Sequence, residues 1–177
     1  MISLFGGAAQ CILPSGWVDA SRFRQVPDHQ EVYLDTVSSS SVIIEILESQ
    51  EKGIRFCFDD LAAADSAVSS IVHKQETLPT IFWFIPNVPV TKQYIEGVQE
   101  KGDCTKTVSP VFVAMTLLRI PEADILVTTH NVSPKVHFEI CSSLEFFNRQ
   151  LFSYSISNFI EHSIDVNLAT GFRYIRL

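Results

Sequence analysis

Two stretches that are apolar on both faces of a β-strand constrain this fold most. Residues 42–47 and 111–118 consist mainly of β-branched and aliphatic side chains. Successive side chains of a strand point to opposite sides of a sheet, so such strands need apolar cover on both sides. We therefore expect a central sheet with helices on both faces, or a strongly curved sheet that wraps one helix.

The other strand signals favour an antiparallel arrangement. Shorter β-prone stretches lie at residues 8–13, 30–35, 71–76, 93–100 and 125–130, and the serines at 38–41 read as a loop. Residues 120–124 form a short polar link that contains proline, which is typical of a hairpin between residues 111–119 and 125–130. Because hairpins join antiparallel strands, we predict an α+β fold with a curved, mostly antiparallel sheet of about six strands flanked by helices.

Two helices are expected to cover this sheet. Asp59 or Asp60 can cap an alanine-rich helix at residues 61–68 by accepting a backbone N–H. A longer amphipathic helix is predicted at 136–154, where apolar residues recur at intervals of three and four. Those residues are Phe138, Cys141, Leu144, Phe147 and Leu151. The length of 177 residues fits a single domain at 1–177.

Composition limits the classes of partner. Hydrophobic residues make up 46% of the chain and charged residues 19%, which is enough apolar material for a core. The net charge is −7 and the lysines and arginines are scattered, so no nucleic-acid partner is expected. We see no secretory signal and no run long enough to span a bilayer, so we expect a reduced protein in nucleus and cytoplasm, with no membrane partner. We also expect a monomer.

Motifs for catalysis or cofactor binding are missing from the sequence. It contains no Gly-x-Ser-x-Gly, no His-Glu-x-x-His and no phosphate-binding loop after Gly6 and Gly7, which read as a tight turn. The five histidines are dispersed, and the four cysteines are too widely spaced for a zinc site. We therefore expect no enzyme activity, no metal and no cofactor, and we expect free thiols in or near the core.

A set of short strings carries a family resemblance. They read LFGGA at 4–8, PSG at 14–16, DASxxRxVPDHQEV at 19–32, SVIIEILE at 41–48, FCFDDL at 56–61 and LLRIP at 117–121. Together they resemble the Ran guanine nucleotide release factor family, also called the Mog-one family. Residues 4–61 and 111–132 match well, whereas residues 69–109 match poorly and the tail after residue 158 is longer than the family's usual end.

The resemblance implies a fold and a function. The family fold is a curved, mainly antiparallel sheet between helices that is shared with PsbP proteins. The implied activity is binding of the small GTPase Ran and promotion of guanine nucleotide release, which regulates nuclear protein import. The alternative is a non-catalytic assembly module on the same fold with another partner. The implied Ran-binding residues are Asp28, Gln30, Glu31, Glu45 and Glu48.

Strand geometry separates two of these acidic residues. If residues 42–48 form a regular strand, Glu45 and Glu48 point to opposite faces of the sheet, unless the strand ends or bulges near Leu47. A carboxylate within an apolar strand must also reach water or a partner. We nevertheless expect charge reversal at Glu45 or Glu48 to weaken Ran binding with the fold intact. Asp28 has a simpler alternative role in its turn.

Overall fold

The computed structural model describes residues 1–49, 51–82, 89–101, 109–120 and 123–146. Its main sheet has seven strands in the order β3-β4-β5-β9-β8-β7-β6, and every described pairing within it is antiparallel. The strands are β3 (Trp17–Asp19), β4 (Gln30–Asp35), β5 (Ser41–Glu48), β6 (Ala67–Phe82), β7 (Pro89–Lys101), β8 (Ser109–Arg119) and β9 (Ala123–His130). The predicted fold class, including the hairpin between β8 and β9, is confirmed.

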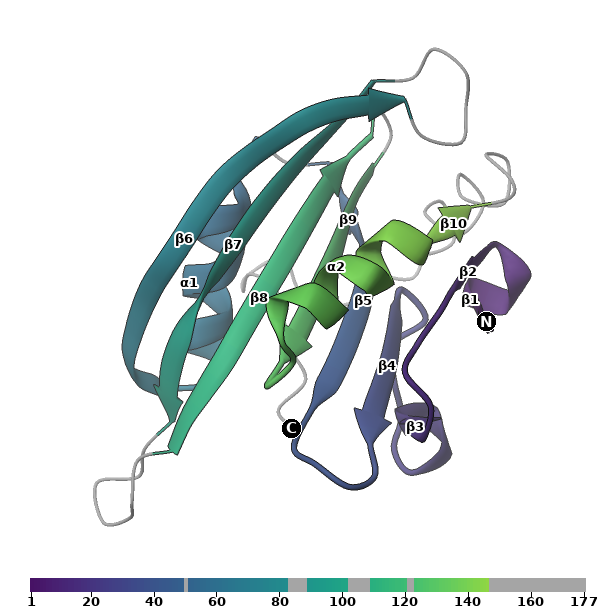
Figure 1. Ribbon diagram of the computed structural model, residues 1–177, viewed down its shortest axis with the longest axis horizontal. Helices are drawn as coiled ribbons and strands as arrows, with labels where there is room; N and C mark the ends of the chain where they lie inside the picture. The colour runs from purple at the N-terminus through teal and green to yellow at the C-terminus, as the bar shows by residue number, and fades with distance from the viewer. Residues whose placement is uncertain (50, 83–88, 102–108, 121–122, 147–177) are drawn as a thin grey trace, which may run out of the picture.

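Smaller elements lie at the N-terminal side of the main sheet (Figure 1). A three-stranded sheet in the order β1-β2-β10 combines β1 (Ile2–Leu4), β2 (Ala9–Cys11) and β10 (Glu145–Phe146). Short 3-10 turns follow two strands, namely η1 (Phe5–Gly7) after β1 and η2 (Ala20–Arg22) after β3. The strand expected at residues 8–13 is therefore present as β2, but it is shorter than predicted.

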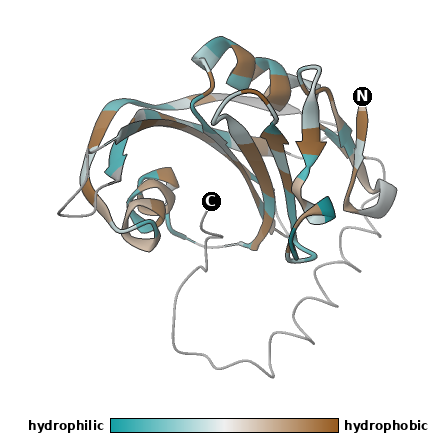
Figure 2. Ribbon diagram, turned by 90° about the horizontal axis from the view of Figure 1, so that it is seen from below, coloured by the Kyte–Doolittle hydropathy of each residue, from teal (hydrophilic) through white to brown (hydrophobic). Residues whose placement is uncertain are grey.

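Helices cover both faces of the main sheet. Helix α1 (Ile54–Ala64) lies behind the sheet in Figure 1 and helix α2 (Pro134–Ser143) lies in front of it. Figure 2 shows that the sheet curves around α1, so that α1 occupies the concave side and α2 the convex side. Both arrangements that we expected, cover on two faces and a sheet wrapped around a helix, are thus combined in one molecule.

The central strands divide their side chains between these two layers. On the convex side, β5 contributes Val42, Ile44 and Ile46, which pack with Ile140 and Cys141 of α2. The concave side forms a second core, made by Leu47, Ile54, Cys57, Phe58, Leu61, Ile95, Val113, Met115, Leu117 and Leu126. Each fully buried aliphatic or aromatic side chain contributes roughly 1.5–3 kcal/mol, so both helices are held chiefly by the sheet.

Close approach of α1 to the sheet depends on a glycine. A Cβ added at Gly97 would lie 2.1 Å from the Ile71 carbonyl oxygen and 2.9 Å from the Phe58 ring. Both distances are shorter than any relaxed carbon contact, so only glycine leaves room for the backbone of β6 and the ring from α1 at this point of β7.

The first helix begins earlier than predicted. The expected helix at 61–68, capped by Asp59 or Asp60, is wrong, since α1 starts after Gly53 and ends at Ala64. The N-cap residue, Gly53, has no side chain to cap the helix; instead the Gln93 side-chain oxygen caps it by accepting the Ile54 N–H at 2.9 Å. Asp59 lies within the helix and forms an ion pair with Arg55 at 2.8 Å.

The second helix is shorter than predicted. It was expected at 136–154 but spans Pro134–Ser143, with the Ser133 hydroxyl accepting the Val136 N–H as its cap. Extended backbone at Leu144 ends the helix, because Glu145 of β10 pairs with Gln10 of β2. Phe147 and Leu151, which we assigned to the helix, lie outside the described residues.

A buried histidine fixes α2 to the convex face. His137 Nε2 lies 2.8 Å from the Thr116 hydroxyl of β8, and Nδ1 lies 2.8 Å from the Thr129 hydroxyl of β9. Burial, followed by the charge of Lys92, lowers the pKa of His137 to about 3. The ring is therefore neutral at physiological pH and acts as a hydrogen-bonding bridge between the helix and two strands.

The cysteines that the structure describes match the expectation of free thiols. Cys11, Cys57 and Cys141 are free and buried, whereas Cys104 lies outside the described residues. Burial is the main cause that raises the pKa of Cys141 to about 11. Its thiol is thus a packing group rather than a nucleophile.

Candidate functional site

The motif residues Asp28 and Glu48 lie at the same end of the β4–β5 pair. Residues Gln30 and Glu45 face each other in the register of the two strands, and the Ile46 N–H extends the pairing by donating to the His29 carbonyl at 2.9 Å. Asp28 sits in the turn before β4, and Glu48 is the last residue of β5. Both side chains are exposed, so this edge presents two carboxylates to solvent.

Glu45 and Gln30 lie inside the protein. Their exposed fractions are 4% and 5%, and the Gln30 amide donates a hydrogen bond to the Glu45 carboxylate. Burial raises the pKa of Glu45 to about 7, and the hydrogen bond from Gln30 opposes that rise. In this conformation neither side chain can reach a partner's surface, so charge reversal at Glu45 would not leave the fold intact as we had expected.

Glu31 serves the N-terminal segment. It is half-buried on the convex face, and its carboxylate accepts the backbone N–H of Phe5. Desolvation raises the pKa of Glu31, although the bond from Phe5 acts in the opposite direction. Phe5 has φ 49° and begins a left-handed turn that continues through Gly6 and Gly7. The carboxylate therefore fixes a backbone conformation that a phenylalanine rarely adopts.

The expected separation of Glu45 from Glu48 is present in the sheet. The pairing of β5 with β9 is regular up to the last residue, with Glu45 opposite Leu126 and Glu48 opposite Ala123. No bulge reverses the alternation, so the two carboxylates point to opposite faces. The strand thus places Glu45 in the interior and Glu48 in solvent.

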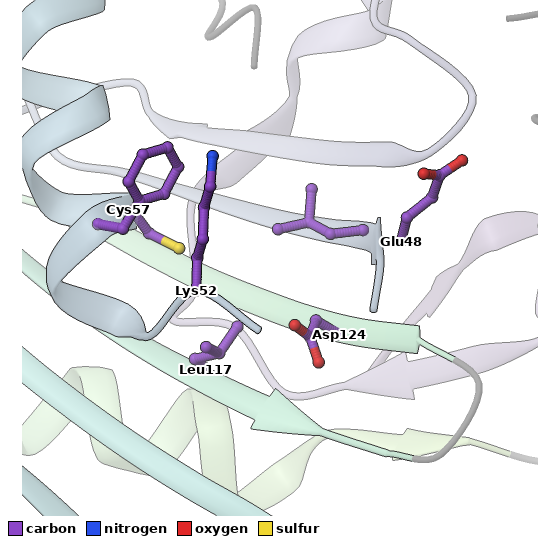
Figure 3. A pocket seen from close by; sticks show the side chains of 7 residues that line it. Glu48, Lys52, Cys57, Leu117 and Asp124 are labelled. Carbon is purple, nitrogen blue, oxygen red and sulfur yellow. The ribbon is translucent and has the colours of Figure 1, made fainter. Parts of the chain in front are cut away.

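Glu48 borders a shallow pocket at the start of α1. Figure 3 shows the seven lining residues, which are Leu47, Glu48, Lys52, Phe56, Cys57, Leu117 and Asp124. Asp124 is 3.0 Å from Arg119, and the Arg119 guanidinium also donates to the Lys52 carbonyl at 2.8 Å. Among the described residues, the Glu48 carboxylate forms no hydrogen bond or ion pair.

Three polar or aromatic members of this pocket escaped the sequence analysis. Lys52 lies in a link between elements, Phe56 entered only as part of the FCFDDL string of the family resemblance, and Asp124 was assigned to the polar link at 120–124. Their common location depends on how α1 packs beside the end of β5, which the sequence pattern did not reveal. The FCFDDL string at 56–61 was the one available signal, because it places an aromatic ring close to charged residues.

The described residues give no sign of an independent catalytic centre. Within them, no group of three or more histidine, cysteine, aspartate or glutamate side chains is placed to hold a metal ion. None of the helices in the described ranges is long and apolar enough to cross a membrane. What the described residues offer is an acidic, partly apolar end of the β4–β5 pair on an antiparallel α+β domain.

Comparison with protein families identifies that class more closely. The model of a family described as "Ran-interacting Mog1 protein" matches residues 2–132. The "Ran guanine nucleotide release factor" of Bos taurus is 31% identical over 140 residues, which cover 75% of each chain. The "Nuclear import protein mog1" of Schizosaccharomyces pombe is 37% identical over 84 residues, covering 44% of each. This chain belongs to the Ran-interacting Mog1 family.

Solved structures support the fold assignment. A variant of protein Mog1 superposes with a TM-score of 0.65 at 17% identity, covering 85% of this chain and 97% of the other. The PsbP protein of the cyanobacterium Synechocystis gives a TM-score of 0.52 at 11% identity, covering 82% and 91%. The predicted likeness to the PsbP fold is therefore confirmed. At these identities the comparison bears on the fold alone.

Proposed function

We propose that this protein binds Ran and promotes release of its guanine nucleotide, and thereby regulates nuclear protein import. Membership of a Ran-interacting family supports the choice of partner. The observation that carries the site is the exposed carboxylate of Glu48, which has no partner among the described residues and lies at the same end of the sheet as Asp28. A net charge of −7 favours encounter with a basic surface.

The mechanism that we propose is competition for the groups that hold the nucleotide. A GTPase binds its nucleotide through backbone amides, a lysine and Mg²⁺, which together neutralise the phosphates. Carboxylates presented to the same basic elements compete with the phosphates. A protein that binds the nucleotide-free state more tightly must weaken nucleotide binding by the same factor, because the two equilibria are linked.

The five motif residues divide into two roles under this proposal. Asp28 and Glu48 contact the partner, because they are exposed. Gln30 and Glu45 hold the pairing of β4 with β5 from inside, and Glu31 holds the turn at Phe5. The chain itself provides binding groups and no catalytic residue. We further propose that it acts as one domain and as a monomer, in nucleus and cytoplasm; the name of the fission yeast relative, a nuclear import protein, supports the nuclear part of this proposal.

Binding measurements with purified Ran test this proposal. The wild-type protein is expected to bind nucleotide-free Ran more tightly than Ran loaded with nucleotide. Glu48→Lys should weaken binding about fivefold or more, since a lost surface charge pair costs about 1 kcal/mol and a new repulsion adds to it. Glu139→Lys is the matched control, because Glu139 is an exposed acidic residue of another element, α2.

Two outcomes decide against the proposal in different ways. If Glu48→Lys and Glu139→Lys bind Ran as the wild type does, with circular dichroism unchanged, the contact surface lies elsewhere. If the wild type binds Ran in neither state, the Ran-binding role itself fails for this chain. An assembly module on the same fold, with another partner, would then be the better interpretation.

A further inference from the structure

The pocket beside Glu48 already holds a cation from the protein itself. The ammonium nitrogen of Lys52 lies 3.8 Å from the centroid of the Phe56 ring, in the first turn of α1. This is a cation–π contact, in which the negative face of the ring attracts the charge. Lys52 is exposed, so its side chain can leave the ring without opening the core.

The remaining walls of the pocket are partly apolar. Leu47 and Leu117 supply apolar surface, on which the methylene groups of a lysine or arginine can pack. Glu48 and Lys52, which both line the pocket, extend to the same side in Figure 3. The lining of the pocket thus combines aliphatic side chains, an aromatic ring and an acidic group without a partner among the described residues.

The charges around the pocket do not already satisfy this site. Asp124 is neutralised by Arg119, with which it forms two hydrogen bonds of 3.1 and 3.0 Å. Arg119 also fixes the backbone of Lys52 through its carbonyl, which leaves only the lysine side chain adjustable. No ion pair within 4.0 Å joins Lys52 to Glu48 among the described residues. A second cation at Glu48 would therefore break no ion pair of Glu48 with a described residue.

We propose that this pocket receives a lysine or arginine side chain of the partner, and that Lys52 is an intramolecular competitor that this side chain displaces from Phe56. The incoming stem packs on Leu47 and Leu117, and its charged end lies between the ring and Glu48. The inference rests on the proposed function, because it names the chemistry of the group on Ran that the same edge would bind.

A double-mutant cycle on Ran binding tests this competition. Lys52→Met removes the charge and keeps the length of the side chain, and it should tighten binding about two- to fivefold, the range expected for an exposed cation–π contact. Phe56→Leu should weaken binding. In the Phe56→Leu background, Lys52→Met should give no gain, because no ring remains to compete for.

Matched controls separate this effect from a general change of charge. Lys135→Met removes a lysine that is 85% exposed on α2, on the other side of the sheet. It should leave Ran binding within twofold of the wild type. An independent signal comes from NMR of the Lys52 methylene groups, whose resonances should be shifted by the Phe56 ring in the free protein and should move toward random-coil values when Ran binds.

The outcomes are distinguishable. A gain from Lys52→Met that is equally large with and without Phe56, or that Lys135→Met reproduces, would show a non-specific charge effect and overturn the competition. A Lys52 resonance that keeps its ring shift in the complex would overturn it as well. Failure of the wild type to bind Ran would reject the proposed function and this inference together, whereas binding without coupling rejects this inference alone.

Discussion

Replacing Glu45 by glutamine should change the way in which stability depends on pH. The carboxyl group is 4% exposed, and its pKa rises from 4.5 to about 7 because burial penalises the charged form. Since the folded-state pKa is raised, the stability that this group contributes is complete below pH 4.5 and is lost as pH rises through 7. The difference between the two pKa values corresponds to a loss of about 3 kcal/mol in the free energy of unfolding, at about 1.4 kcal/mol for each pH unit.

Glutamine has nearly the same shape and stays neutral at every pH. Glu45→Gln should therefore gain in stability over the wild type as pH rises from 4.5 to 7, by up to about 3 kcal/mol, and the difference should then level off. It also offers amide protons to Gln30 Oε1, a buried atom without a hydrogen-bond partner. Glu45→Gln should therefore be more stable than the wild type, and the difference in the free energy of unfolding should be largest near pH 8.

Urea denaturation at pH 5 and pH 8 measures this difference. The control is Glu48→Gln, which makes the same chemical change at an exposed residue of the same strand and should show a small, pH-independent effect. A difference between Glu45→Gln and wild type that stays constant across this range would refute the reasoning. It would mean that Glu45 is hydrated or paired with a cation in solution.

Two further predictions concern the folded core. The pKa of His137 is lowered to about 3, so the stability that this histidine contributes is complete above pH 6.5 and is lost as pH falls toward 3. His137→Leu should lower the free energy of unfolding by about 2–4 kcal/mol at pH 7. Denaturation curves should show this deficit shrinking by about 1.4 kcal/mol per pH unit below pH 6.5, and a deficit that stays constant would contradict the prediction. Gly97→Ala should destabilise the protein by about 1–3 kcal/mol in thermal unfolding, because the new Cβ would collide with Ile71 and Phe58. The control is Gly53→Ala, whose Cβ meets only a flexible side-chain oxygen at 3.3 Å and which should destabilise far less. Equal effects of the two substitutions would argue against close packing at Gly97.

The strands were predicted best where side-chain alternation or β-branching was strong. Residues 30–35 match β4, and β5 begins only one residue before the predicted stretch, because both patterns depend on local sequence. Helix boundaries failed where tertiary contacts decide them. The start of α1 is capped by Gln93 from a distant strand, and the end of α2 follows from pairing of Glu145 with β2. Neither partner can be recognised from the segment itself.

The candidate site was predictable in part. Alternation correctly placed Glu45 and Glu48 on opposite faces, and the rule that a carboxylate among apolar residues needs a partner anticipated the bond from Gln30. The identity of that partner depends on the register between β4 and β5, which no local pattern specifies. The pocket with Lys52 and Phe56 also depends on helix docking, so the sequence pointed to one strand of the candidate site but not to the other residues that line the pocket.

Release of a fluorescent guanine nucleotide from Ran tests the central claim most directly. Ran loaded with the labelled nucleotide would be mixed with excess unlabelled nucleotide and with wild type, Glu48→Lys or Glu139→Lys, each with unchanged circular dichroism. We predict that the wild type and Glu139→Lys accelerate release equally and that Glu48→Lys accelerates it markedly less. Release at the intrinsic rate of Ran in the presence of the wild type would contradict the account, and equal acceleration by all three would place the acidic contact elsewhere.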